Sequence, residues 1–184
     1  MKLLVVSDNH GDRDILVKLQ QEYVDKMDLM IHCGDSELAV DDEIFDNMPS
    51  VLGNNDWGQP FPEKRLLEVA SERVLVTHGH LYNVNFNLDK LVMLARRRNA
   101  SIIAYGHTHQ LAVTMQNGKL YINPGSISLP RGEYSYLGGT YAIITTSKTQ
   151  VDVQYYNRAM EPVEDLHFTF ERNMKLFLSI LKCQ

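Results

Sequence analysis

The sequence predicts an α/β fold in which an early part with parallel strands is followed by a part with antiparallel strands. In the first 105 residues, short apolar runs are interspersed with two segments of helical periodicity, a pattern typical of buried strands connected by helices. Beyond that point the chain contains β-rich stretches and an Asn117-Gly118 dipeptide, a strong short hairpin signal. We therefore expect parallel and antiparallel strands in one molecule.

The early strands are short, continuous apolar runs, as expected for strands buried on both faces of a sheet. We predict them, in chain order, at Leu3–Val6, Leu29–His32, Ser50–Leu52, Leu66–Ala70, Arg73–Thr77 and Ser101–Tyr105. A first helix follows Asp12, which is placed to cap it, and its apolar residues extend to Met27. A second helix covers Leu88 to Asn99.

The later strands flank turns rich in glycine, proline and asparagine. We predict strands at Leu111–Gln116, Lys119–Ile122, Gly139–Thr145 and Gln150–Tyr156. A long loop, punctuated by glycine and proline, extends from Asn123 to Gly132. Near the end of the chain, apolar residues at helical spacing between Met174 and Lys182 predict a helix that closes the core. A helix lying on a membrane or a partner is the alternative for this segment.

Length, charge and cysteine usage restrict the class of protein. The chain has 184 residues, which favours one domain over residues 1–184. Its 18 Lys and Arg residues against 23 Asp and Glu give a net charge of -5, which argues against a clamp for duplex nucleic acid. The sequence has only two cysteines and no signal-peptide or membrane-spanning apolar run, so we expect a cytoplasmic protein without a membrane partner.

The histidines are concentrated in one part of the sequence, since six of the seven lie within the first 109 residues. Five predicted strands end in loops that contain Asp, Asn or His. These loop residues are Asp8 and His10; Asp35; Asn54, Asn55 and Asp56; His78 and His80; and His107 and His109. Because residues beyond the carboxyl ends of the strands line the ligand crevice of open α/β sheets, we expect these loops to converge.

The residue types in these loops are those of a transition-metal site. Asp8 and His10, like His107 and His109, are two positions apart, so in an extended backbone each pair would project to one side and bind one centre. The candidate ligands are Asp8, His10, Asp35, Asn54, His78, His107 and His109. Four imidazoles, two carboxylates and an amide exceed the needs of one tetrahedral zinc, which predicts two ions such as Mn, Fe, Co, Ni or Zn. Asp35, in a tight Gly-Asp turn, is the candidate bridge.

These motifs, in this order, resemble those of the calcineurin-like metallophosphoesterases. The matching residues are Asp8-x-His10, Gly34-Asp35, Gly53-Asn54-Asn55-Asp56, His78-Gly79 and Gly106-His107-Thr108-His109. The short chain and its Asn123-Pro124-Gly125-Ser126 loop are similar to the small bacterial and archaeal phosphodiesterases of that superfamily. The resemblance implies a four-layer αββα sandwich, in which two mixed β-sheets are flanked by helices.

The resemblance also implies how the ligands are divided. One ion would be held by Asp8, His10, Asp35 and His109, and the other by Asp35, Asn54, His78 and His107. Asp35 would again be the bridge, and manganese is the ion we favour. The implied reaction is the hydrolysis of a small phosphate ester, foremost a phosphodiester, by a hydroxide that bridges the two ions.

The residue after the motif asparagine departs from the wider superfamily, in which a histidine that helps to protonate the leaving group is common. Here this residue is Asn55, which can donate a hydrogen bond to phosphate but cannot act as a general acid. We therefore expect a preference for good leaving groups. The residues assigned to catalysis are Asn55, Asp35 and His78, and those assigned to substrate contact are Asn55, His80 and Arg131. Asp56 is expected to orient a ligand such as His10 or His78.

Other chemically capable residues are either set aside from the site or left open. His32 lies within an apolar run and His167 has no partner motif, so neither is assigned to the site. Cys33 lacks a free base nearby and is expected to be a buried packing residue. Trp57 and Tyr82 are equally suited to stacking on a nucleobase and to packing at the base of a loop.

Three alternative functions stay open. A phosphomonoesterase would use the same site, because the ligands fix the nucleophile but not the number of ester bonds. A nuclease acting on short single strands is disfavoured by the lack of a basic groove. A protein-binding scaffold that resembles the small subunit of retromer would have lost ligands, whereas each ligand position here is filled. A homo-oligomer is one option for the assembly.

Overall fold

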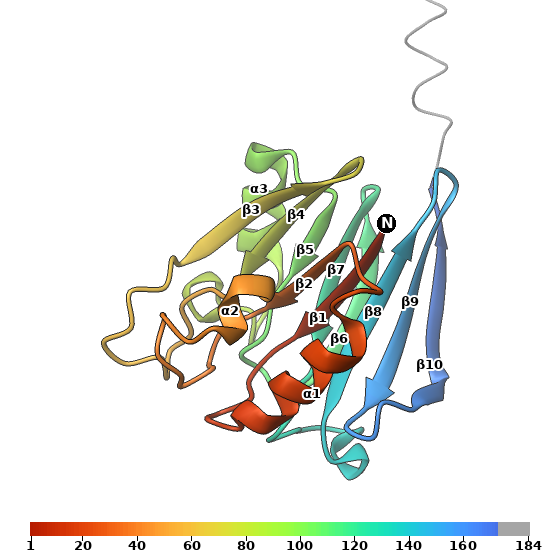
Figure 1. Ribbon diagram of the computed structural model, residues 1–184. Helices are drawn as coiled ribbons and strands as arrows, with labels where there is room; N and C mark the ends of the chain where they lie inside the picture. Colours follow the sequence, from red (N-terminus) through yellow and green to blue (C-terminus); the bar gives the residue numbers. More distant parts are fainter. Residues whose placement is uncertain (173–184) are drawn as a thin grey trace, which may run out of the picture.

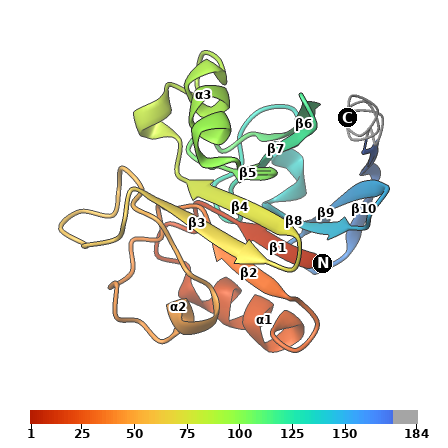
Figure 2. The ribbon, with the colours of Figure 1, turned by 90° about the horizontal axis from the view of Figure 1, so that it is seen from above.

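The computed structural model describes residues 1–172, and they form two β-sheets packed face to face (Figure 1). The view from above shows four layers, with α1 and α2 outside one sheet and α3 outside the other (Figure 2). The four-layer αββα sandwich with two mixed sheets is therefore confirmed. The helix predicted between Met174 and Lys182 lies outside the described residues.

The first sheet contains both ends of the described chain. Its strands are β1 (Lys2–Val6), β2 (Leu29–His32), β8 (Thr140–Thr146), β9 (Gln150–Asn157) and β10 (Pro162–Glu171), in the spatial order β10-β9-β8-β1-β2. Strands β1 and β2 are parallel, and Val6 lies opposite His32. The other pairs in this sheet are antiparallel. The register places the carboxyl ends of β1 and β2 side by side.

The second sheet has the same size and its own pair of parallel contacts. Its strands are β3 (Lys64–Val69), β4 (Glu72–Thr77), β5 (Ile102–Ala104), β6 (Leu111–Gln116) and β7 (Lys119–Pro124), in the spatial order β3-β4-β5-β7-β6. Strand β5 is parallel to both β4 and β7, with Val76 opposite Ala104. The predicted Asn117-Gly118 hairpin joins β6 to β7, and both turn residues have positive φ.

Three apolar layers hold the sandwich together. The central layer fills the space between the sheets and includes Leu3, Val5, Val76, Ile122 and Tyr155. Helices α1 (Arg13–Tyr23) and α2 (Ile44–Asn47) cover the outer face of the first sheet, and α3 (Asp89–Arg98) covers that of the second. Two short 3-10 segments, η1 (His80–Tyr82) and η2 (Ser135–Leu137), lie in connecting loops. None of the helices in residues 1–172 is long and apolar enough to cross a membrane.

Two predicted elements differ in extent from the structure. The run Ser50–Leu52 makes only a single bridge, between Ser50 and His32, because the N–H of Leu52 donates to the carbonyl of Pro62 instead of continuing along β2. Helix α1 begins after Asp12, whose side chain accepts from the N–H of Ile15, but it ends at Tyr23 rather than at Met27. The chain turns there so that Asp28 can donate to the carbonyl of Lys2 at the start of β1.

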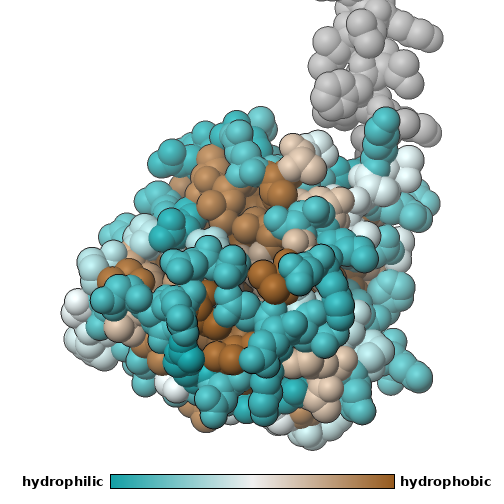
Figure 3. Space-filling view, in the orientation of Figure 1, coloured by the Kyte–Doolittle hydropathy of each residue, from teal (hydrophilic) through white to brown (hydrophobic). Residues whose placement is uncertain are grey.

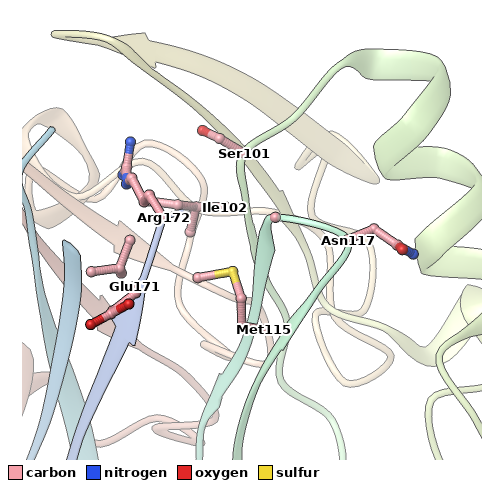
Figure 4. A pocket seen from close by; sticks show the side chains of 8 residues that line it. Ser101, Ile102, Met115, Asn117, Glu171 and Arg172 are labelled. Carbon is pink, nitrogen blue, oxygen red and sulfur yellow. The ribbon is translucent and has the colours of Figure 1, made fainter. Parts of the chain in front are cut away.

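A cavity of about 320 Å³ opens between the sheets at the amino-terminal end of β5. Val151 is one of its apolar lining residues. Figure 4 shows two others, Ile102 and Met115, together with Glu171 and Arg172. In the view of Figure 3 the surface is mostly hydrophilic, and hydrophobic side chains gather toward the top of the molecule. The cavity at the amino-terminal end of β5 is at the opposite end of the sheets from the carboxyl ends of the parallel strands, where the predicted ligands lie.

Candidate metal centre

The loops that follow β1, β2, β4 and β5 converge at one end of the sandwich, as predicted. The loops after β1 and β2 continue the pairing of their strands, since Asp8 N donates to Gly34 O at 3.1 Å and His10 N donates to Asp35 O at 3.2 Å. The second sheet does the same where Gly106 N donates to His78 O at 2.9 Å. These loops and the turn at Asn54 bring all seven predicted ligands into one set of contacts.

A first cluster consists of Asp8, His10, Asp35 and His109. One ligand atom from each residue lies within 4.8 Å of the others. His109 Nε2 is 3.4 Å from Asp8 Oδ1 and 3.2 Å from His10 Nε2. Asp8, Asp35 and His109 are buried, and His10 is partly buried. The cluster has the donor types and spacing of a transition-metal site.

The hydrogen bonds around the first cluster leave its inner atoms free to bind a cation. His10 Nδ1 is 2.7 Å from Glu37 Oε1, and His109 Nδ1 donates to Leu129 O at 2.7 Å. In the neutral rings the two Nε2 lone pairs therefore face each other. Asp8 Oδ1 is buried and has no hydrogen-bond partner among the described residues. Facing lone pairs and a buried bare carboxylate oxygen are costly without a cation, so these residues fit a metal ion.

A second cluster adjoins the first through Asp35. His78 Nε2 lies 3.4 Å from Asp35 Oδ1 and 3.1 Å from Asn54 Oδ1. His107 Nδ1 is 2.7 Å from the same Asn54 oxygen, while its Nε2 contacts the side-chain amide of Asn85 at 3.0 Å. His78 Nδ1 donates to Cys33 O at 2.8 Å, which points its Nε2 toward the cluster. Asp35 therefore stands between two groups of candidate ligands.

Burial and charge shift the pKa values of these groups. Burial raises the pKa of Asp8 above its ordinary value, and the nearby His78 only partly opposes it. Burial also raises the pKa of Asp35, but His78 and the two donors of Asn55 outweigh it, so the pKa lies below its usual range. Burial and the neighbouring His78 lower the pKa of His107 to about 4. His107 is therefore neutral near pH 7, the state in which imidazole binds metals.

The backbone at the ligands is left-handed rather than extended, so the geometric reason given for the two spaced pairs was wrong. The φ angles are positive at five ligands: Asp8 (56°), His10 (45°), Asp35 (54°), His107 (71°) and His109 (59°). Such values are uncommon outside glycine and gather at functional sites. Asp8 and His10 still meet in the first cluster, but His107 turns to Asn54 while His109 turns to Asp8. The second pair is therefore divided between the clusters.

Asp56 supports the site through the backbone and not through a histidine. Its Oδ2 accepts from Asp35 N at 3.0 Å and from Gly53 N at 2.7 Å, and its Oδ1 accepts from Ser36 Oγ at 3.0 Å and Glu37 N at 2.8 Å. The predicted contact with His10 or His78 is absent from its hydrogen bonds within residues 1–172. Asp56 instead ties the loop of Asp35 to the turn that carries Asn54.

The three residues predicted to contact substrate lie near the two clusters, and each has different neighbours. Asn55 donates its main-chain N–H to Asp35 Oδ1 at 2.8 Å and its Nδ2 to Asp35 Oδ2 at 2.7 Å, so it holds the carboxylate of Asp35 in place. The ring centroid of His80 is 5.3 Å from that of His78. Arg131 has an exposed side chain, and its N–H donates to His109 O at 3.0 Å.

The residues that were not assigned to the site differ in how deeply they are buried. His32 and Cys33 are buried, as predicted, and the pKa of His32 is lowered to about 4 by burial. His167 is exposed on β10. Tyr82 packs against the apolar layer beneath α3. Trp57 is different, because 84% of its surface is exposed and packing does not account for it.

Sequence reasoning missed the outer partners of the ligands. Glu37 and Asn85 contact ring nitrogens of His10 and His107, and main-chain carbonyls of Cys33 and Leu129 contact those of His78 and His109. The carbonyls have no residue-specific signal, and neither Glu37 nor Asn85 stands in a recognisable motif. Ser126, in the predicted loop, was assigned no partner and donates to Asp8 O at 2.6 Å.

Comparison with known proteins agrees with the fold and the ligand cluster, which together define a metal-binding hydrolase. Residues 1–149 match the calcineurin-like phosphoesterase superfamily domain, and the chain belongs to this family of metal-dependent phosphoesterases. The Bacillus subtilis protein "Probable metallophosphoesterase YsnB" is 37% identical over 90% of this chain and 96% of its own length. The structure of a "predicted phosphoesterase" from Streptococcus pneumoniae TIGR4 has a TM-score of 0.89 at 35% identity, covering 93% of this chain and 97% of that one.

More distant structures share the fold alone. An archaeal phosphodiesterase has a TM-score of 0.60 at 21% identity, covering 93% of this chain and 99% of that chain. Vps29 from Entamoeba histolytica, in a structure with Zn²⁺, has a TM-score of 0.67 at 18% identity, covering 94% of this chain and all of that chain. At these identities, the similarity says nothing specific about the activity of this chain.

Proposed function

We propose that the protein is a dinuclear metal-dependent phosphodiesterase acting on small phosphate esters. One observation carries the proposal: the Asp35 carboxylate belongs to the first cluster and lies 3.4 Å from His78 Nε2 in the second. A carboxylate in that place can offset the repulsion between two dications. The proposed ligands are those predicted from the sequence, with Asp8, His10 and His109 on one side of Asp35 and Asn54, His78 and His107 on the other.

The residues of the chain would bind and orient the reacting groups. The ligands would hold two divalent transition-metal ions, of which we favour manganese, and these would supply Lewis acidity to the phosphate ester and to the attacking water. Asn55 keeps both oxygens of Asp35 in place through its two donors. The carbonyls of Cys33 and Leu129 and the carboxylate of Glu37 fix the rings of His78, His109 and His10. These contacts hold the site in shape before substrate binds.

The absence of a proton donor at position 55 favours diesters with good leaving groups. Asn55 is neutral, and its Nδ2 is occupied by Asp35. It therefore cannot protonate an alkoxide as the ester bond breaks. We expect rates that fall steeply as the pKa of the leaving group rises, and a rate that barely depends on that pKa would count against the proposal.

Two alternatives make different predictions. A phosphomonoesterase would hydrolyse p-nitrophenyl phosphate faster than bis(p-nitrophenyl) phosphate, whereas the diesterase should prefer the latter. A scaffold like Vps29 would bind a protein partner without needing the complete ligand set. The complete ligand set, which includes the bare, buried Asp8 Oδ1 and the facing Nε2 atoms of His10 and His109, is what an enzyme needs and a scaffold does not.

The proposal is tested by metal analysis together with hydrolysis of bis(p-nitrophenyl) phosphate. We expect two transition-metal ions per chain, and about a hundredfold or greater loss of kcat/KM in Asp35→Ala and Asp35→Asn. Asp165→Asn, a change at an exposed position on β10, is the matched control and should leave the rate unchanged. A wild-type protein without transition metal, or an Asp35→Ala variant with full activity, would refute the proposal.

A further inference from the structure

A cavity beside the second cluster is lined in part by residues that the proposed hydrolysis does not use. It measures about 380 Å³ and lies between the turn at residues 52–59 and His80. This volume falls within the range of about 300–1,000 Å³ that is common for small-molecule sites. Asn54 lines the cavity and also contacts His78 and His107 in the second cluster. A group bound here would therefore lie next to a phosphate held at the metal centre.

The wall includes one exposed aromatic residue, Trp57. This residue is 84% exposed, and it is the only tryptophan in the chain. Large aromatic side chains favour burial, and an exposed one beside a cavity offers a flat surface on which a planar group can stack. Single exposed apolar residues are also common on protein surfaces without a function. The hydrogen bonds that hold the turn of Trp57 against the metal site distinguish it from such a residue.

The turn that carries Trp57 is fixed to the metal site. Trp57 N donates to Asn55 O at 2.9 Å, and Gln59 N donates to Asp56 O at 3.2 Å. Asn55 in turn donates to the carboxylate of Asp35, and Asp56 accepts from the N–H groups of Asp35 and Gly53. The backbone of Trp57 is thereby held at a defined place relative to Asp35. The fixed backbone restricts where the indole can lie, which lowers the conformational entropy that is lost when a planar group stacks on it.

Two polar groups in the cavity suit a ring with hydrogen-bonding edges. Gln59 Oε1 accepts from Val40 N at 2.9 Å, which fixes the amide and leaves Nε2 as a donor. His80 also lines the cavity. A nucleobase has donors and acceptors along its edge that can pair with such polar side chains, whereas a simple alkyl group has none.

We infer that this cavity binds the nucleoside part of a phosphodiester substrate, with Trp57 stacking on the base. The inference rests on the proposed function, because it names the ester group that is retained on phosphorus when the other ester bond is hydrolysed. Trp57 acts here in specificity and takes no part in bond breaking. Nucleoside binding does not require a basic groove, since the metal centre would bind the phosphate and the ring would bind the base.

Two diesters with the same leaving group test this inference. The p-nitrophenyl ester of thymidine 5′-phosphate is compared with ethyl p-nitrophenyl phosphate, so that differences in leaving-group chemistry cancel. We expect Trp57→Ala to raise KM for the nucleoside diester on the order of tenfold, with kcat and the KM of the ethyl diester unchanged. Trp57→Phe should keep most of the preference. Tyr136→Ala removes an exposed aromatic that does not line the cavity, and it should behave like the wild type.

Binding can also be measured without turnover, because Trp57 is the only source of tryptophan emission. Thymidine 5′-monophosphate should quench this emission saturably, and inorganic phosphate should not. Equal KM changes for both diesters in Trp57→Ala, or no quenching, would overturn the inference. If the wild type hydrolyses neither diester, the proposed phosphodiesterase function fails. Saturable quenching in that case would still support nucleotide binding in the cavity.

Discussion

Each end of the two sheets contains a buried carboxylate, but only one of the two carboxylates has hydrogen-bond partners for both of its oxygens. At the amino-terminal end of β4, Glu72 is buried and fully paired, accepting from Ser101 Oγ at 2.7 Å and from the guanidinium of Arg172. At the carboxyl ends of the parallel strands, Asp8 is equally buried, but its Oδ1 has no hydrogen-bond partner within residues 1–172.

The pKa values of the two carboxyl groups differ accordingly. Burial raises the pKa of Glu72, but Ser101 and Arg172 outweigh it, so that the pKa lies below its ordinary value. The pKa of Asp8 is raised, because burial is only partly compensated by His78. A carboxylate whose pKa the fold lowers, as in Glu72, contributes to stability when it is ionised. One that the fold leaves uncompensated indicates a place for a cation.

The largest difference between the two ends should be seen in activity. We expect His109→Ala to lower kcat/KM on bis(p-nitrophenyl) phosphate by about a thousandfold, because it removes a ring that faces Asp8 and His10. His167→Ala, at an exposed site on β10, should have no effect. Steady-state kinetics with added manganese measures both. Loss of less than about threefold in His109→Ala would mean that the first cluster does not hold a catalytic metal.

Metal binding should stabilise the folded protein only through the ligands at the carboxyl ends of the parallel strands. At a free manganese concentration a hundred times above Kd, we expect the free energy of unfolding to rise by about 2.7 kcal/mol. Chemical denaturation of metal-free protein, with and without manganese, measures this change. His109→Ala should lose most of the gain, whereas Glu72→Gln should keep it. An equal gain in His109→Ala and the wild type would place the bound ion elsewhere.

A smaller effect on stability is expected at the amino-terminal end of β4, where Glu72 lies. Glu72→Gln should lower the free energy of unfolding by about 1–2 kcal/mol near neutral pH, with activity unchanged, because it weakens a buried charge-assisted pair with Arg172. Since the folded pKa of Glu72 lies below its ordinary value of 4.5, its contribution is complete above that value and is lost as pH falls through the folded pKa. Denaturation curves across this acidic range should show the variant losing less stability than the wild type.

The sequence was most informative where residue type alone determines the outcome. Continuous apolar runs predicted β1, β2, β4 and β5, and Asn117-Gly118 predicted the hairpin. Asp and His in strand-end loops predicted the ligands that meet in space. The run at Ser50–Leu52 failed as a strand because its hydrogen bonds depend on Pro62, which no local pattern reveals.

The finer geometry of the site could not be predicted because it depends on contacts distant in sequence. Asp8 and His107 are 99 positions apart, and the N–H of His107 donates to Asp8 Oδ2 at 3.2 Å. Left-handed φ at non-glycine ligands contradicts local preference and is held by the surrounding loops. The carbonyls of Cys33 and Leu129 act through the main chain, so their residue types give no signal.

The comparison between the two ends is tested most directly by the stability of Asp8→Asn in the absence of metal. This substitution removes a buried charge that no group of the described fold compensates fully, while keeping the shape of the side chain. We predict that metal-free Asp8→Asn is more stable than the metal-free wild type by about 1 kcal/mol or more near neutral pH, although it loses metal binding and activity. A metal-free variant less stable than the wild type would contradict the conclusion that Asp8 is held in place for a cation.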